Sequence, residues 1–268
     1  MRRKLKRLAM LALILGVIVL LHLQVKREAE EAAGQAAVTK SEDSAAVLTD
    51  GDETPAIPVM GAAAASGRLE ENEGGGVRVI VPGEDGTDRV YVFTDVSADS
   101  WYANAVNYVV SAGLMNGEGD SGLFRPEYGI LRESFATILY RFAKGVPEEP
   151  RYSFEDVPED SWFREAVNWV ANERLMTGLT PSSFGVGQYM TCEQAIIGLY
   201  RLAGEPETDG SLKDYPYAAK VSDAGRSAVD WAWKIGLITE VECVWYPTQA
   251  ISRAQVALLL MRYSSMAV

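Results

Sequence analysis

The hydrophobic and polar positions of the chain follow one pattern that occurs three times. The copies begin at Phe93, Phe154 and Tyr215, and so start 61 residues apart. Each copy holds a first stretch with apolar residues at helical spacing, then a loop, then a second helical stretch. A fixed period of this kind indicates units that bury their apolar faces against one another. The predicted helix–loop–helix repeats cover residues 93–145, 154–204 and 215–263.

Helix-capping signals mark the start of the second helix in two of the copies. Thr191 with Gln194, and Ser252 with Gln255, have the spacing of a capping box. The first copy has Leu131 at this place, so we expect it to lack a cap that contributes about 1 kcal/mol. Because there are only three units, we predict a compact pseudo-threefold bundle of all-α class rather than an open solenoid.

Residues 1–27 have the order of an export signal: basic residues, an apolar run and further basic residues. The apolar run from Leu8 to Val25 has 18 residues. This length lies at the lower edge of what spans a bilayer and is long for a cleaved signal. We predict an exported chain, in which this segment is either retained as a membrane anchor or removed as a signal peptide.

Residues 28–88 form the next segment, which is rich in Ala, Glu, Gly and Ser and has little periodicity. Such a sequence buries too little apolar surface to offset its ordering entropy, so we predict a disordered linker. Alternating apolar positions at residues 77–92 predict short strands there, or an extended chain that docks on the first repeat.

Charge and composition exclude several functions. The formal net charge is −12, and all charged residues among the first 27 are basic, so the rest of the chain is strongly acidic. An acidic body repels a phosphate backbone, which argues against nucleic acid as a partner. The single histidine, His22, lies in the apolar run, and two cysteines cannot build a zinc site. No catalytic set stands out, so we predict a protein that is not an enzyme and needs no metal or cofactor.

Four short motifs occur in register in the first copy and in part in the second. An F-x-D-V is followed by a tryptophan, then by G-L-M-x-G, by F-x-P, and by a helix that opens in the manner of T-R-A-E. Together they resemble the S-layer homology domain from Phe93 to about Tyr263, and the third copy is similar mainly in spacing and in ISRAQ. The resemblance implies three tandem repeats that form a helical spindle. It also implies binding of secondary cell-wall polysaccharide, often pyruvylated, in grooves between repeats.

The resemblance further implies which positions bind the glycan. The second helix opens with a signature arginine in the first and third copies, whereas the second copy has Cys192 there. An arginine in a first helical turn, beside free backbone N–H groups, suits a carboxylate or ketal acid, and a tryptophan suits a sugar ring. The implied binding residues are Arg132, Arg253, Asp95, Trp101, Asp156, Trp162, Gly117 and Gly178.

Structural interpretations of the same residues stay open. Trp101 and Trp162 lie at apolar helix positions of the kind found in cores, and both aspartates can cap local backbone. Arg132 can be an ordinary surface charge. Cys192 and Cys243 either form a disulfide or remain two buried free thiols.

These expectations combine into one function and one alternative. We predict a non-catalytic, extracellular protein that anchors to the bacterial cell wall through secondary cell-wall polysaccharide, and to the membrane if its N-terminal segment is retained. The alternative is a degenerate module that serves as a structural or protein-binding domain at the cell surface. We expect no obligate homo-oligomer.

Overall fold

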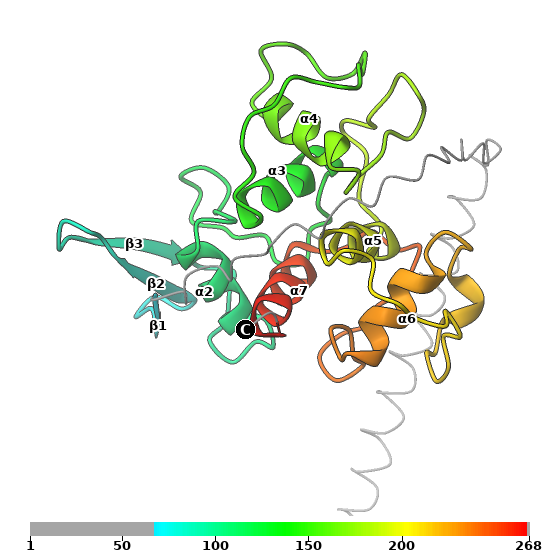
Figure 1. Cartoon of the computed structure of the whole chain (residues 1–268). Coiled ribbons are helices and arrows are strands. Elements are labelled where there is room, and N and C mark those ends of the chain that lie inside the picture. Colours follow the sequence, from blue (N-terminus) through cyan, green and yellow to red (C-terminus); the bar gives the residue numbers. More distant parts are fainter. Residues whose placement is uncertain (1–66, 267–268) are drawn as a thin grey trace, which may run out of the picture. The chain divides into compact units, whose positions relative to one another are not determined.

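The computed structural model describes residues 67–266 of the chain. The predicted signal segment, and residues 28–66 of the predicted linker, lie outside the described residues. Within residues 67–266, no helix combines the length and the apolar character needed to span a membrane. Figure 1 shows that strands come first in this part of the chain and that α-helices follow.

The strands form one antiparallel sheet in the order β1-β2-β3. They are β1 (Arg68–Glu71), β2 (Val77–Pro82) and β3 (Asp88–Phe93). The helices fall into the three sequence repeats as pairs. The first helices are α2 (Ala103–Ser111), α4 (Arg164–Asn172) and α6 (Arg226–Lys234). The second helices are α3 (Arg132–Phe142), α5 (Cys192–Leu202) and α7 (Arg253–Met266).

The sheet shows that the predicted all-α class is wrong, because the described residues combine a three-stranded sheet with six α-helices. β2 and β3 are the strands predicted within residues 77–92, whereas β1 lies in the segment predicted as disordered linker. Along β2, Val77 and Val79 are fully buried and Arg78 between them is not. The sheet contacts α2, and three strands packed on a helix can bury enough apolar surface to be stable.

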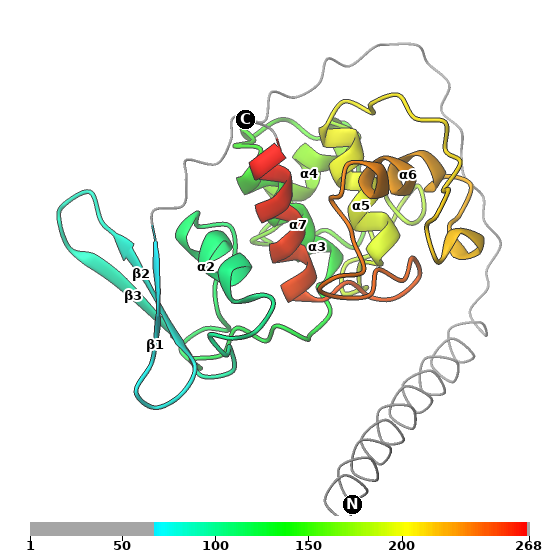
Figure 2. The same cartoon turned by 90° about the horizontal axis from the view of Figure 1, so that it is seen from below.

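The helices pack in pairs that cross the boundaries of the sequence repeats. α3 of the first repeat packs against α4 of the second, and α5 of the second packs against α6 of the third. The last helix, α7, packs against α2 of the first repeat (Figure 2). Each repeat therefore completes its neighbour, and the third repeat closes the set on the first.

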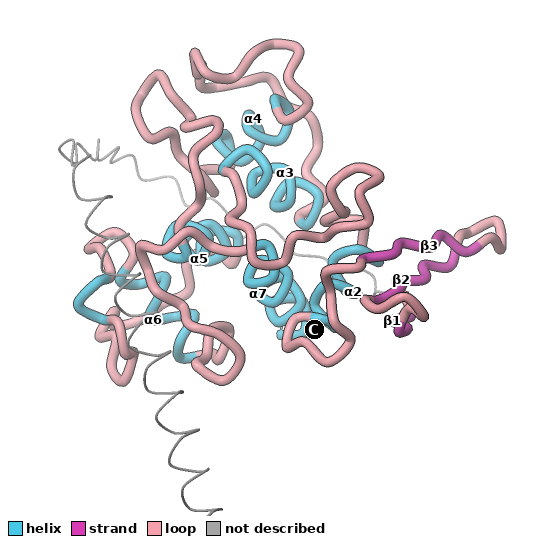
Figure 3. The backbone as a smooth tube through the Cα atoms, turned by 180° about the vertical axis from the view of Figure 1, so that it is seen from behind, coloured by secondary structure: helices cyan, strands magenta, loops and turns pink. Residues whose placement is uncertain are grey.

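A ring of three backbone hydrogen bonds joins the repeats just before their second helices. The amide of Met190 donates to Ile130 and that of Ile251 donates to Met190, both at 2.9 Å. The amide of Ile130 donates to Ile251 at 3.0 Å and closes the ring. All three residues are buried. α3, α5 and α7 therefore begin around a common pseudo-threefold axis, with α2, α4 and α6 outside them (Figure 3).

The helix caps agree with the sequence. Thr191 and Gln194 form the predicted capping box at the start of α5. Ser252 and Gln255 make the same two hydrogen bonds at the start of α7, at 2.8 and 3.2 Å. Leu131 gives α3 no side-chain cap. The capping predictions are therefore confirmed for all three second helices.

Replacement of Thr191 by alanine is expected to lower the free energy of unfolding by about 1 kcal/mol, because the amide of Gln194 loses its side-chain acceptor. Urea denaturation followed by circular dichroism would measure the change. Ser182→Ala, in an exposed loop, is a control that should leave the urea midpoint within error. Equal midpoints for the two variants would contradict a role of this cap in stability.

Candidate functional site: the junctions between repeats

Arg132 begins α3 and reaches from the first repeat into the loop of the second. Its Nε donates to the carbonyl of Phe184 at 2.9 Å, and its Nη2 donates to the carbonyl of Thr177 at 2.7 Å. The guanidinium carbon lies 5.0 Å from the centre of the Phe184 ring. Arg132 is only 4% exposed, and burial lowers its pKa to about 10. Arg132 is therefore not a surface charge. We call it a latch, meaning an arginine that donates to the loop carbonyls of a neighbouring repeat and so holds the two repeats together.

Arg253 is a second latch, which reaches from the third repeat into the loop of the first. Its Nε donates to the carbonyl of Phe124 at 2.7 Å, and its Nη2 donates to the carbonyl of Asn116 at 2.6 Å. The guanidinium carbon lies 4.7 Å from the centre of the Phe124 ring. Arg253 is half-buried, and burial lowers its pKa. This latch joins the last repeat to the first.

The backbone amides at the three helix starts are already engaged. Each donates at 2.9 Å to a carbonyl of a neighbouring repeat: Arg132 to Gln188, Cys192 to Gln249, and Arg253 to Tyr128. The sequence suggested that these amides would be free to bind an acid group. Since they hold the repeats together instead, an acid group of a ligand would need other donors at the junctions.

Asp95 and Asp156 shape the loops that the latches grip. The Asp95 carboxylate accepts from the amides of Phe124 and Arg125, at 2.8 and 2.7 Å. The Asp156 carboxylate accepts from three successive amides, Phe184 to Val186, at 2.7–2.8 Å. Both side chains therefore cap backbone, which fixes the loop carbonyls to which the arginines donate.

Gly117 and Gly178 lie where the loops leave no room for a side chain. A Cβ on Gly117 would lie 2.7 Å from the ring of Phe93, and one on Gly178 would lie 2.5 Å from the carbonyl oxygen of Thr180. These glycines allow the close packing of the loops. Their implied contact with a glycan stays a prediction.

The two tryptophans of the opening motif differ in their surroundings. Trp101 is half-buried, and its ring meets that of Tyr102 edge-on, with 5.1 Å between the ring centres. Trp162 is 68% exposed and meets Phe163 in the same way, at 5.3 Å. The interpretation as a core residue is therefore wrong for Trp162, because this residue precedes the first residue of α4 and lies exposed at the start of the helix.

A groove of about 710 Å³ opens beside Trp162. Its walls come from the connection between the first and second repeats and from the start of α4, and the one cation among them is Arg164. The lining carboxylates are Glu148, Glu149, Glu159, Asp160 and Glu165. This negative surface repels anions, so the surroundings of Trp162 do not suit a pyruvylated polymer.

Arg125 and Tyr128, in the loop of the first repeat, are accessible residues that the sequence did not single out. The Arg125 guanidinium lies 5.0 Å from the centre of the Tyr128 ring and pairs with Glu118 at 2.7 Å. Tyr128 is 59% exposed, and the Arg125 side chain is 36% exposed. Both residues lie in the loop that Arg253 grips, so this junction presents a cation and a ring together.

The backbone of Arg125 is unusual. Its φ is 60°, in the left-handed region, where the second repeat has Gly185 with a φ of 89°. Lys144, Arg174, Glu205, Leu212 and Asp214 also have a positive φ, so this conformation does not by itself mark a functional site. The sequence shows only the difference itself, an arginine in the first copy at a position that is glycine in the second.

Cys192 and Cys243 are free thiols, so the disulfide considered from the sequence is absent. Cys192 is 1% exposed and Cys243 is half-buried. Burial raises the pKa of Cys192 to about 12 and that of Cys243 to about 11. Because the thiolate is the reactive form, neither cysteine is suited to nucleophilic or redox chemistry near neutral pH.

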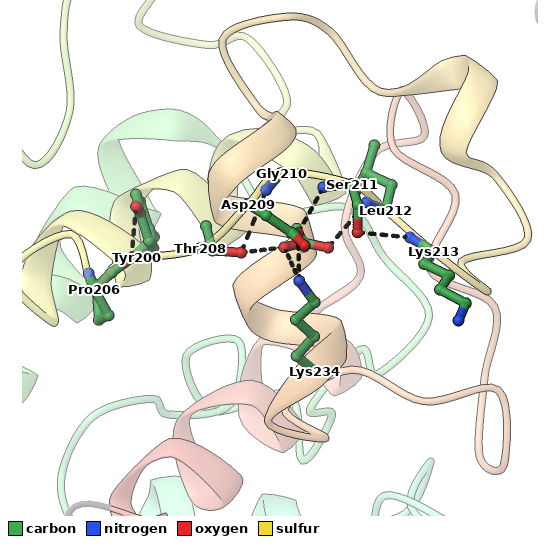
Figure 4. A network of polar contacts seen from close by, with 10 residues as sticks. Tyr200, Pro206, Thr208, Asp209, Gly210, Ser211, Leu212, Lys213 and Lys234 are labelled. Atoms are coloured by element: carbon green, nitrogen blue, oxygen red, sulfur yellow. Dashed lines mark hydrogen bonds and ion pairs between the residues drawn. The ribbon is translucent and has the colours of Figure 1, made fainter.

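A polar network ties the connection between the second and third repeats to α6. Asp230 is fully buried and accepts from the amide of Leu212 at 2.9 Å, from Lys234 Nζ at 2.7 Å and from the hydroxyl of Thr208. Lys234 also donates to Asp209 at 2.5 Å (Figure 4). The network fixes the segment that leads into the third repeat, so we assign it a structural role.

Comparison with protein families matches residues 92–136 and 153–196 to the S-layer homology domain. The matches fall on the first and second repeats and include Asp95, Arg132 and Asp156. The third repeat lies outside them, although it takes part in the same ring of backbone hydrogen bonds.

Several curated proteins are similar to the repeat region. The chain is 28% identical over 148 residues to the "Surface-layer 125 kDa protein" of Lysinibacillus sphaericus, and the aligned residues make up 54% of the chain and 12% of that protein. It is 27% identical over 142 residues to the "Cell surface protein" of Thermoanaerobacter kivui, which covers 50% and 18%. It is 23% identical over 173 residues to "S-layer protein sap" of Bacillus anthracis, which covers 62% and 20%. The chain therefore spans a fifth or less of the length of these relatives.

Proposed function

The chain is an S-layer homology domain protein, and on this premise we propose that it is held on a bacterial cell wall by binding a cell-wall polysaccharide. The binding is non-covalent and involves no catalysis. Names such as surface-layer and cell surface protein among the relatives support this location. We count the third repeat as an S-layer homology domain in this proposal, because its helix start and its arginine make the same contacts as those of the first.

The observation that carries the proposal is the pairing of Arg125 with Tyr128 at the junction between the third and first repeats. An exposed tyrosine ring offers a flat face to a sugar, and a guanidinium beside it can donate two hydrogen bonds to an acid group. Arg253 adds a half-buried positive charge behind the same loop. A saccharide that carries a carboxylate, as a pyruvate ketal does, matches this combination.

The ion pair between Arg125 and Glu118 does not prevent such binding. The two side chains are 36% and 62% exposed, and exposed pairs contribute only about 0–1 kcal/mol. An acid group of the polymer can therefore replace the Glu118 carboxylate on Arg125.

The other two junctions lack this pair. At the two corresponding positions the second repeat has Gly185 and Gln188, and the third has Tyr246 and Gln249. Neither combination places a guanidinium beside an aromatic ring. We therefore propose one main binding junction, where Asp95 shapes the loop, whereas Arg132 and Asp156 act by holding the loop of the second repeat.

Export belongs to the same proposal. Residues 1–27, which lie outside the described residues, would direct the chain across the membrane. If this segment is retained, the protein would connect membrane and wall.

Co-sedimentation of the full-length chain with purified cell-wall sacculi tests the proposal, in mild non-ionic detergent because residues 8–25 are apolar. We expect binding that is lost when the secondary polymer is stripped from the sacculi. Arg125→Ala and Tyr128→Ala should each weaken binding by about tenfold, which corresponds to about 1.4 kcal/mol. Both changes lie on the surface, so the urea midpoint should move little.

Two control variants remove an arginine and a tyrosine ring away from the proposed site. Arg226→Ala removes an exposed arginine of α6, and Tyr152→Ala removes an exposed ring just before the second repeat. Both should bind sacculi like the unmodified chain. Folded protein that stays in the supernatant, or equal losses for the site variants and the controls, would sink the proposal and favour a protein partner.

A further inference from the structure

The junction between the second and third repeats lacks the arginine latch but keeps the backbone frame. Cys192 occupies the position of Arg132 and Arg253, and its amide still donates to Gln249 at 2.9 Å. The backbone hydrogen bond from the amide of Ile251 in the third repeat to the carbonyl of Met190 in the second is also present. At this junction, a donor other than arginine must therefore pair with the loop carbonyl that accepts from an arginine at the other two junctions.

At the other two junctions, three residues make one motif. An arginine donates to the carbonyl of a loop phenylalanine and lies over its ring, while a second phenylalanine from the start of the repeat packs on that ring. The distance between the two phenylalanine ring centres is 5.6 Å in both cases. The two sets are Arg132, Phe184 and Phe154, and Arg253, Phe124 and Phe93.

The third junction has different residues at all three positions: Cys192, Trp245 and Tyr215. The carbonyl of Trp245 corresponds to the carbonyls of Phe184 and Phe124, which accept from the arginines at the other two junctions. It accepts a hydrogen bond from the hydroxyl of Tyr215. Tyr215 stands where the other repeats have phenylalanine, so this donor exists only in the repeat whose loop has lost its arginine.

The sizes of the three side chains also differ from those at the other two junctions. Cysteine is much smaller than arginine, whereas tryptophan and tyrosine are each larger than phenylalanine. Cys192, Trp245 and Tyr215 are all buried, at 1%, 1% and 5% exposure, so the larger rings add volume inside the protein at the junction where the side chain at the arginine position is short.

We infer that Tyr215 and Trp245 together replace the arginine latch at this junction, with the Tyr215 hydroxyl as the substitute donor and the two rings as the substitute volume. The loop carbonyl of this junction is thereby paired without a latch cation, and the Glu193 carboxylate accepts from the amide and hydroxyl of Ser222 across the junction. This inference concerns how the repeats are joined and does not rest on the proposed wall binding.

Exchange of the three residues in the full-length chain tests the inference by urea denaturation. Tyr215→Phe alone should lower the urea midpoint, because the Trp245 carbonyl loses its donor. Cys192→Arg alone should also lower it, because the site is already filled. The triple variant Cys192→Arg, Trp245→Phe, Tyr215→Phe should recover most of the midpoint lost by the single changes. Tyr217→Phe, a half-buried neighbour, is the matched control.

The reverse exchange at the junction between the third and first repeats gives a second test that does not depend on the folding of Cys192→Arg. Arg253→Cys should lower the midpoint, and adding Phe93→Tyr with Phe124→Trp should restore most of it. Recovery in either triple variant supports the replacement. If both triple variants are as unstable as the sum of their single changes, the three positions are independent and the inference is wrong.

Discussion

Arg132→Ala is expected to lower the free energy of unfolding by about 3–5 kcal/mol. Two loop carbonyls, of Thr177 and Phe184, lose charged donors, and hydrogen bonds to charged groups contribute about 1.5–3 kcal/mol each. The shortened side chain also leaves a void at a site that is 4% exposed, and the Phe184 ring loses the guanidinium that covers it. The effect should fall on the contact between the first and second repeats.

Urea denaturation of the full-length chain measures the loss, and two further variants separate its causes. Arg132→Lys keeps the charge, but an ammonium cannot reach both carbonyls with the planar geometry of a guanidinium, so an intermediate loss is expected. Arg125→Ala removes an arginine from a surface pair and should cost less than about 1 kcal/mol. A midpoint for Arg132→Ala close to that of Arg125→Ala would show that the latch contributes little.

The contrast between Arg132 and Arg125 separates stability from binding. Arg132 is buried and its hydrogen bonds go to the protein, so its replacement should act on folding first. Arg125 is accessible and beside an exposed ring, so its replacement should act on the proposed wall binding first. A loss of sacculus binding in Arg132→Ala is informative only when the urea midpoint is measured on the same sample.

The sequence predicted what depends on local spacing. The repeat starts at Phe93, Phe154 and Tyr215, and the capping boxes at Thr191 and Ser252, follow from side-chain period and cap chemistry within a few residues. The strands within residues 77–92 were visible for the same reason.

What the sequence could not give were pairings at long range. Arg132 contacts Phe184, 52 residues further along the chain, and Arg253 contacts Phe124, 129 residues earlier. The local sequence around a signature arginine is the same whether its side chain faces solvent, a ligand or a neighbouring loop. Its role follows only once α3 is known to pack with α4 and α7 with α2.

Two further predictions failed because a regional pattern was extended too far. The all-α class followed from the helical repeats and left out the three-stranded sheet, whose first strand, β1, lies in a stretch interpreted as linker. Trp162 fits the helical apolar stripe, yet it precedes the first residue of α4 and turns outward at the rim of an acidic groove. Periodicity assigns a face within a helix and is weakest at the helix end.

Closure of the set has a consequence for the proposed site. The loop with Arg125 and Tyr128 belongs to the first repeat, but the arginine that holds its carbonyls comes from the third repeat. The binding surface is therefore complete only when the end of the chain has packed on the first repeat. Wall binding and the packing of α7 against α2 should be lost together.

Asp156→Ala is expected to have the second large effect, a loss of about 2–4 kcal/mol in the free energy of unfolding. Three successive amides, from Phe184 to Val186, donate to this carboxylate, and Ser183 adds its hydroxyl at 2.8 Å. Removing the acceptor leaves amides without a partner in a loop that is partly buried. Asp95→Ala removes the acceptor of only two amides, so its loss should be smaller.

The Asp156 carboxylate should also give the protein a specific acid sensitivity. Burial acts to raise its pKa, but the donors from Val186, Phe184, Ser183 and Gly185 outweigh burial, and the pKa is lowered. A carboxyl with a lowered pKa in the folded state stabilises the fold above its unfolded pKa of about 3.9, and this contribution is lost as pH falls through the folded value. The urea midpoint of the unmodified chain should therefore drop as pH falls below about 4.

Asp156→Asn provides the matched test of this pH dependence, because it keeps the shape of the side chain but cannot titrate. At pH 7 the variant should already be less stable, since its amide group is a weaker acceptor and brings two N–H donors towards the loop amides. Below pH 4 its midpoint should fall less steeply than that of the unmodified chain, so the two curves should converge. Parallel curves from pH 7 to pH 3 would mean that other carboxylates govern acid unfolding, and that the loop which Arg132 grips is held without the charge of Asp156.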